Sequence, residues 1–139
     1  MPHDNLEREC DRLSQIVDSP QFERLRWDRN EGPMLAQLVA LAHAAFERRS
    51  EFELAEEGST TAAKRFVLKI HGNRIVAISI WLKDGLAHVG AGQIDRSAYR
   101  LAGGDPCTAE FEAVDEEWMA NALQVLFGRV HTQQQPETL

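Results

Sequence analysis

The sequence is poor in cysteine and in aromatic side chains, and it carries no excess of positive charge. Its two cysteines, Cys10 and Cys107, lie far apart and form no closely spaced metal or redox motif. No apolar run approaches the roughly 18 residues that a membrane-spanning helix needs. The first residues lead into a charged segment, not into the apolar part of a signal peptide. We therefore expect a cytoplasmic protein with free thiols, no metal, no cofactor and no membrane partner.

The formal net charge of −7 argues against a general affinity for nucleic acid or anionic membranes, since both attract positive surfaces. The chain has 139 residues, of which 43% are hydrophobic and 27% charged, as is usual for one globular domain. We expect a single α+β domain over residues 1–130 and a disordered C-terminal tail over 131–139.

Apolar side chains recur at helical spacing in three segments, which predict helices over 4–18, 33–49 and 116–130. The first segment has one apolar stripe, formed by Leu6, Cys10, Leu13 and Val17. Asp115 is expected to cap the last helix, because its side chain can accept a hydrogen bond from the first turn. Residues 20–29 fit either a short helix or a strand, and Asn30–Pro33 predicts a break.

Between the helices the pattern predicts an antiparallel meander with strands over 64–71, 74–83 and 86–94. Gly72-Asn73 and Asp84-Gly85 suit the two-residue turns that such hairpins need. Flanking strands are expected over 51–55 and 108–114, and a loop over 95–107. The predicted fold is therefore α+β: N-terminal helices, a meander of about four to five strands, and a C-terminal amphipathic helix packed on the sheet.

These turns fix a register and hence the residues that share a face. One face is uniformly aliphatic and is the expected core. The other has large residues at its ends and small ones between them, which makes a shallow trough. The trough includes Phe66, Leu68, Ser79, Trp81 and His88. Three interpretations stay open: a helix of the same chain covers the trough, a partner or second copy covers it, or it holds a small ligand.

Evidence for catalysis is sparse. The chain has no phosphate-binding glycine loop and no HExxH or GxSxG motif. His88 is the histidine best placed for acid–base work, but neither Asp84 nor Asp95 is expected on its face to orient it. We therefore expect no enzymatic activity.

The leading interpretation is a small acidic protein-binding module of the inhibitor, immunity, adaptor or chaperone type. It would occlude or escort a protein partner, and a homodimer is a further expectation. Its contact surface would combine the trough residues with two acidic residues, Glu110 and Glu112. One alternative is a ligand-binding or weakly catalytic domain centred on His88. Another is a nucleic-acid-associated regulator that uses a basic–aromatic cluster: Arg24, Arg26, Trp27 and Arg29.

Overall fold

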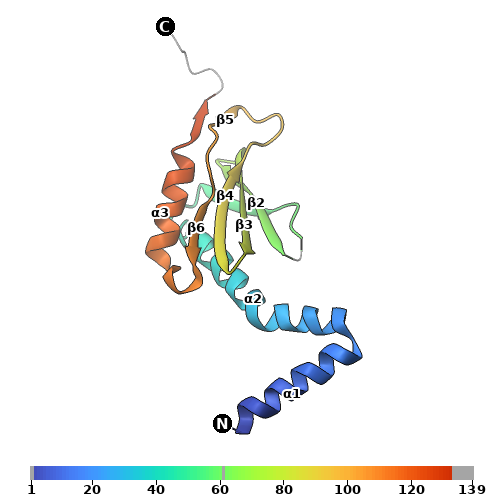
Figure 1. Cartoon of the computed structure of the whole chain (residues 1–139). Coiled ribbons are helices and arrows are strands. Elements are labelled where there is room, and N and C mark those ends of the chain that lie inside the picture. The colour runs from blue at the N-terminus through green and yellow to red at the C-terminus, as the bar shows by residue number, and fades with distance from the viewer. Residues whose placement is uncertain (1, 61, 133–139) are drawn as a thin grey trace. The chain divides into compact units, whose positions relative to one another are not determined.

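The computed structural model describes residues 2–60 and 62–132 and has the expected α+β fold (Figure 1). Its helices are α1 (Pro2–Val17), α2 (Ser19–Ala44) and α3 (Glu116–Phe127), with a short 3-10 helix at Phe111–Ala113. Its strands are β1 (Phe52–Glu56), β2 (Ala63–Ile70), β3 (Asn73–Lys83), β4 (Leu86–Gly92), β5 (Tyr99–Leu101), β6 (Cys107–Glu110) and β7 (Val130–Thr132).

The chain divides into two compact units, residues 1–34 and 35–139. The prediction of one domain over 1–130 stays a prediction. Of the predicted tail, His131 and Thr132 belong to β7, and residues 133–139 lie outside the described part of the chain.

The first unit consists of α1 and the beginning of α2, joined at Asp18. The Asp18 carboxylate accepts a hydrogen bond from the backbone N–H of Gln21 at 3.1 Å, which satisfies a free donor in the first turn of α2. None of the described side chains over 4–34 is fully buried. This helical pair therefore has no closed apolar core of its own.

The predicted break at Asn30–Pro33 is wrong, because α2 runs through it and includes Pro33. The strand alternative for 20–29 is wrong for the same reason. A proline inside a helix removes one backbone hydrogen bond. Burial of Leu35, Leu38 and Ala42 directly after Pro33 favours continuation of the helix despite that loss. The predicted helix over 33–49 is the second part of α2, which ends at Ala44.

The second unit is built on a five-stranded antiparallel sheet with the order β1-β2-β3-β4-β6. We call its aliphatic side the core face. It carries Phe66, Leu68, Val76, Ile78, Ile80, Ala87 and Val89, all of them buried.

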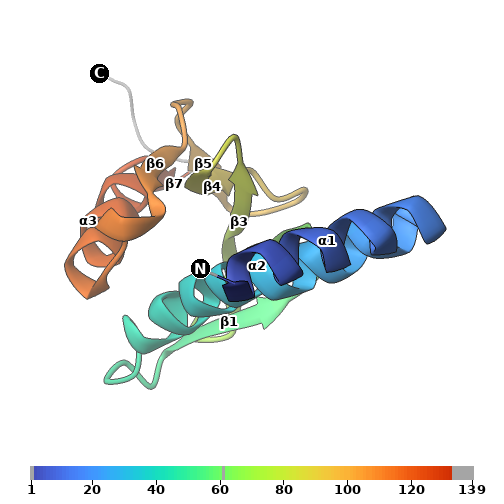
Figure 2. The same ribbon diagram turned by 60° about the horizontal axis from the view of Figure 1, so that its bottom comes forward.

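Helical residues 35–44 and α3 pack on this core face. The His43 ring meets the Phe66 ring edge-on at 5.4 Å, and the Phe46 ring stacks between those of Phe52 and Phe127 at 5.3 and 5.7 Å. The thiol of Cys107 lies 3.8 Å from the carbonyl of Ala122 in α3. Figures 1 and 2 both show α3 beside β6. The C-terminal helix thus packs on the sheet as predicted.

Two smaller features differ from the sequence expectations. β5 lies within the predicted loop over 95–107 and pairs with β7, so that the two form a separate antiparallel ribbon. The predicted strand over 108–114 ends at Glu110 and continues as the 3-10 helix. The Asp115 cap is confirmed, since its carboxylate accepts the Trp118 N–H at 2.8 Å.

Both meander turns have two central residues with positive φ. Asp84 and Gly85, at 54° and 75°, form the second turn as predicted. The first turn is formed by His71 and Gly72, at 52° and 79°, one residue earlier than predicted. Glycine then occupies the second central position of each turn, where it adopts the left-handed conformation without a steric penalty.

Substituting Gly72 tests this turn. Because its φ is +79°, Gly72→Ala is strained, and we expect the free energy of unfolding to fall by about 1 kcal/mol. Gly103→Ala is the matched control, since its side chain would enter open space, and its effect should stay within about 0.5 kcal/mol. Urea denaturation measures both. Equal effects would contradict the placement of the turn.

An ion pair ties the segment after β1 to β3. Arg74 approaches the Glu57 carboxylate at 2.8 Å, and this hydrogen bond holds the pKa of Glu57 below its ordinary value of 4.5. The contribution to stability is therefore present above pH 4.5 and is lost as the pH falls through the folded-state pKa.

We expect Glu57→Gln to lower the urea midpoint slightly at pH 7, because both groups are exposed, and this deficit should shrink as the pH falls through the lowered pKa of Glu57. Glu53→Gln, at an exposed position of β1, is the control and should not show this pH-dependent difference. A Glu57→Gln deficit that stays constant as the pH is lowered from 7 to well below 4.5 would contradict this role of the ion pair.

Candidate functional site

The face of the sheet opposite the core face is called here the trough face. The second hairpin has the predicted register: Trp81 pairs with His88, Ser79 with Gly90, and Ala77 with Gly92. Opposed residues of antiparallel strands point to the same side. These six residues therefore share the trough face.

Two predicted trough residues lie elsewhere. Phe66 pairs with Ile78 and Leu68 with Val76, so both belong to the core face, where they are 3% and 1% exposed. Their assignment to a partner-binding surface was wrong. The cause is a bulge in β3, where Ile75 has no partner between the pairs formed by Leu68 and Lys69.

Arg65 and Val67, opposite Ser79 and Ala77, take the places predicted for Phe66 and Leu68, and Thr108 joins the face from β6. Arg65 pairs with Ser79, and Thr108 of β6 pairs with His88, so both lie on the trough face. The sequence analysis missed them, although Thr108 follows from the alternation of β6 once its pairing with β4 is known. Glu110, opposite Leu86, is exposed on this face at the edge strand, as expected for a contact residue. Glu112 lies beyond the sheet, exposed in the 3-10 helix.

Trp81 dominates the open part of the trough face. Its ring stacks on His88 with centroids 5.2 Å apart and planes inclined by 6°. The indole also covers Gly90: a Cβ atom there would lie 3.2 Å from Trp81 Cη2 and 3.3 Å from Cζ3. These separations are tighter than an ordinary contact, so a side chain at residue 90 would require the ring to shift by a few tenths of an ångström. Trp81 is half-buried, so part of its apolar surface stays accessible.

The environment of His88 supports a structural role. Its Nε2 lies 3.4 Å from the carbonyl of Lys83, which can only accept, so the proton of the neutral ring is assigned to Nε2. Its Nδ1 is buried and has no hydrogen-bond partner among the described residues. A catalytic histidine needs a group that orients the ring and access for the substrate to the other nitrogen. The Lys83 carbonyl can orient the ring, but the burial of Nδ1 leaves a substrate no access to the other nitrogen.

One end of the trough face is closed by the segment after β4. Ile94 packs with Val67 and Ala77, and all three are buried. The Ser97 hydroxyl anchors this segment to β3, 3.2 Å from the carbonyl of Arg74. The other end, with Trp81, is half-buried, and the helical residues 35–44 and α3 lie on the opposite face. Within the described part of the second unit, no helix covers the Trp81 end, where Pro106 lies close to Gly90, its Cβ 3.4 Å from the position of a Cβ at residue 90.

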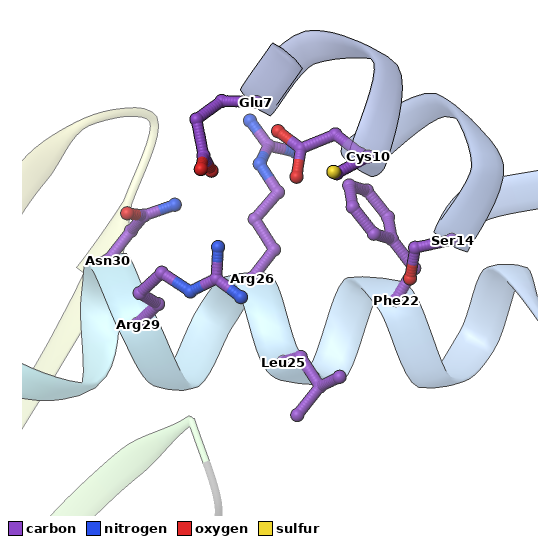
Figure 3. Close-up of a pocket in the computed structure, with 9 residues that line it drawn as sticks. Glu7, Cys10, Ser14, Phe22, Leu25, Arg26, Arg29 and Asn30 are labelled. Atoms are coloured by element: carbon purple, nitrogen blue, oxygen red, sulfur yellow. The ribbon is translucent and has the colours of Figure 1, made fainter. Parts of the chain in front are cut away.

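Three hollows on the described residues lie away from Trp81. The one between α1 and α2 has a volume of ≈ 330 Å³ (Figure 3). A second is lined by the first turn and the start of β3 together with residues 95–99. A third is lined by residues of α2, of α3 and of the segment directly after α2. Trp81, Ser79 and His88 line none of these three. The ligand-binding alternative therefore gains no support from them.

The basic–aromatic cluster is divided between sides of α2. Arg26 and Arg29 line the hollow toward α1, opposite Glu7 (Figure 3). Trp27 is half-buried against Gly32 and does not line the hollow, nor does Arg24. Stacking of a base needs an aromatic ring beside the phosphate-binding cations. The structure does not bring these residues together in that way.

Gly90→Ala tests the close approach of Trp81. The new methyl group would require the indole to shift by a few tenths of an ångström, and we expect a loss of about 1 kcal/mol in the free energy of unfolding. Gly92→Ala is a matched control on the same strand and face, because its Cβ would lie 3.8 Å from that of Ala77, an ordinary contact. Gly92→Ala should cause no loss in the free energy of unfolding. Thermal unfolding with near-ultraviolet circular dichroism separates the two, and equal stability would contradict the stacked geometry.

Two further observations concern metal binding and membrane crossing. They contain no group of three or more His, Cys, Asp and Glu side chains that could hold a metal ion. No helix among them has both the length and the apolar character needed to cross a membrane. Comparison with known proteins finds no family model that matches the chain, no similar curated protein and no similar solved structure.

Proposed function

We propose that this chain is a small, acidic, non-enzymatic protein-binding module and that the Trp81 end of the trough face is its contact surface. The observation that carries the proposal is the half-buried Trp81 ring, held flat on His88 and Gly90 on the open end of the face. Tryptophan residues presented rigidly on a surface are frequent anchors of protein interfaces. Little side-chain entropy is then lost on binding, because the ring is already fixed by its neighbours.

Charged residues of both signs lie on the face of Trp81: Lys83 pairs with Leu86 beside Glu110, and Arg65 pairs with Ser79. Glu110 lies exposed on the same face and Glu112 follows it closely in the chain, within a protein of net charge −7. A complementary surface would offer an apolar pocket for the indole and a lysine or arginine near Glu110. Binding would occlude or escort the partner, because no chemistry on the partner is required of this face.

Affinity capture from a nuclease-treated lysate of the native host tests the proposal. The parent chain should retain a near-stoichiometric protein, identified by mass spectrometry and then purified. Trp81→Ala should weaken its binding by about 10- to 100-fold. Thr108→Lys, at an exposed edge position, should also weaken it because it adds a like charge against a basic partner.

Val125→Ala is the matched control, since Val125 is a 50% exposed apolar residue on α3, away from this face. It should bind like the parent chain. All variants should first give parent-like circular dichroism. Undiminished binding by folded Trp81→Ala and Thr108→Lys would contradict this contact surface, and retention of no protein would contradict the proposed function.

A further inference from the structure

The apolar stripe of α1 is exposed along its whole length. Leu6, Leu13 and Val17 have 60%, 53% and 83% of their surface accessible, and Cys10 between them is exposed as well. Ile16 beside the stripe is 67% exposed. Singly exposed apolar residues are normal, but a continuous helical stripe indicates an interaction surface.

The side of α1 that faces α2 is mainly polar, and Cys10 of the stripe lies at its border. The hollow between the two helices is lined on the α1 side by Glu7, Cys10, Asp11 and Ser14. Figure 3 shows the Glu7 side chain on the side of α1 that faces Arg26 and Asn30 of α2. The contact within the first unit therefore uses the charged side of α1 and leaves Leu6, Leu13 and Val17 unpartnered.

We propose that this stripe pairs with α1 of a second copy of the chain, with the two helices antiparallel. The stripe residues at 6, 10, 13 and 17 are spaced by four, three and four, which is the repeat of coiled-coil seams. When the helix is set against a reversed copy of itself, Leu6 faces Val17 and Cys10 faces Leu13. The stripe residues then form four layers along the interface. Each layer contains one residue from each copy, as a twofold interface requires.

The charge distribution favours the antiparallel direction. All acidic residues of α1 lie between residues 4 and 11, and residues 13–17 carry no charge. Antiparallel pairing sets the acidic part of one helix against the uncharged part of the other, and it also opposes the two helix dipoles favourably. Parallel pairing would gather both acidic parts at one end. The same acidic residues disfavour an anionic membrane as the occupant of the stripe.

The available area suits a reversible dimer. Each exposed large apolar side chain carries on the order of 100 Å² of surface. The five α1 residues named above would bury on the order of 1,000 Å² in two copies. That is the lower end of specific interfaces, so a dissociation constant on the order of micromolar is expected.

Sedimentation equilibrium of the full chain over a wide concentration range measures this association. The parent chain should pass from monomer to dimer. Leu13→Glu should raise the dissociation constant at least about tenfold without unfolding the chain, because the residue is exposed. Gln15→Glu adds the same charge on another side of α1 and is the control. Trp81→Ala should leave the mass unchanged, which separates this proposal from the proposed function.

Disulfide trapping tests the direction, in chains that carry Cys107→Ala. With Leu13→Cys added, Cys10 should form an intermolecular disulfide with the introduced thiol, and mild oxidation should give a covalent dimer identified by peptide mapping. Arg8→Cys, on the other side of the helix, should not cross-link to Cys10.

A chain that stays monomeric, or a dimer that persists unweakened in Leu13→Glu, would overturn the proposal. Efficient cross-linking of Cys10 to Cys10 would show parallel pairing and would overturn the antiparallel arrangement. A foreign protein bound at this stripe in place of a second copy would overturn it as well.

Discussion

One residue without a partner, Ile75 in β3, determines which side chains of β2 the sheet buries. The first turn lies one residue earlier than expected. This change alone shifts each cross-strand partner by two residues, and because side chains alternate with a period of two, every residue stays on its predicted face. The extra residue at the bulge changes the register by one and exchanges the faces. It sends Phe66 and Leu68 into the core and puts Arg65 beside Ser79. The composition of both faces depends on this bulge.

The consequence is a sheet with two unlike faces. Phe66 and Leu68 complete a core face that the second part of α2 and α3 cover. The trough face keeps small residues, and Trp81 lies over Gly90, where the missing side chain leaves space for its ring. A partner would therefore meet a rigid aromatic surface with Glu110 at its edge, not a deep pocket. Such a surface suits protein binding better than catalysis.

Local signals in the sequence predicted much of this arrangement. Asp84-Gly85 fixed the second hairpin, and Asp115 marked the start of α3. The passage of α2 through Pro33 depends on burial that follows it in the chain, which a local breaker signal does not include. The bulge at Ile75 leaves no mark in the alternation of β3, because that strand is apolar on both sides. Helical periodicity likewise predicted α1 but not that its stripe would be exposed.

The central claim is the register between β2 and β3, since the candidate site depends on it. The most direct test is nuclear magnetic resonance of the full chain, with cross-strand backbone Overhauser contacts measured between these strands. The account predicts contacts of Phe66 with Ile78 and of Arg65 with Ser79. Contacts of Phe66 with Ser79 and of Leu68 with Ala77 would contradict it, because they would return Phe66 and Leu68 to the face of Trp81.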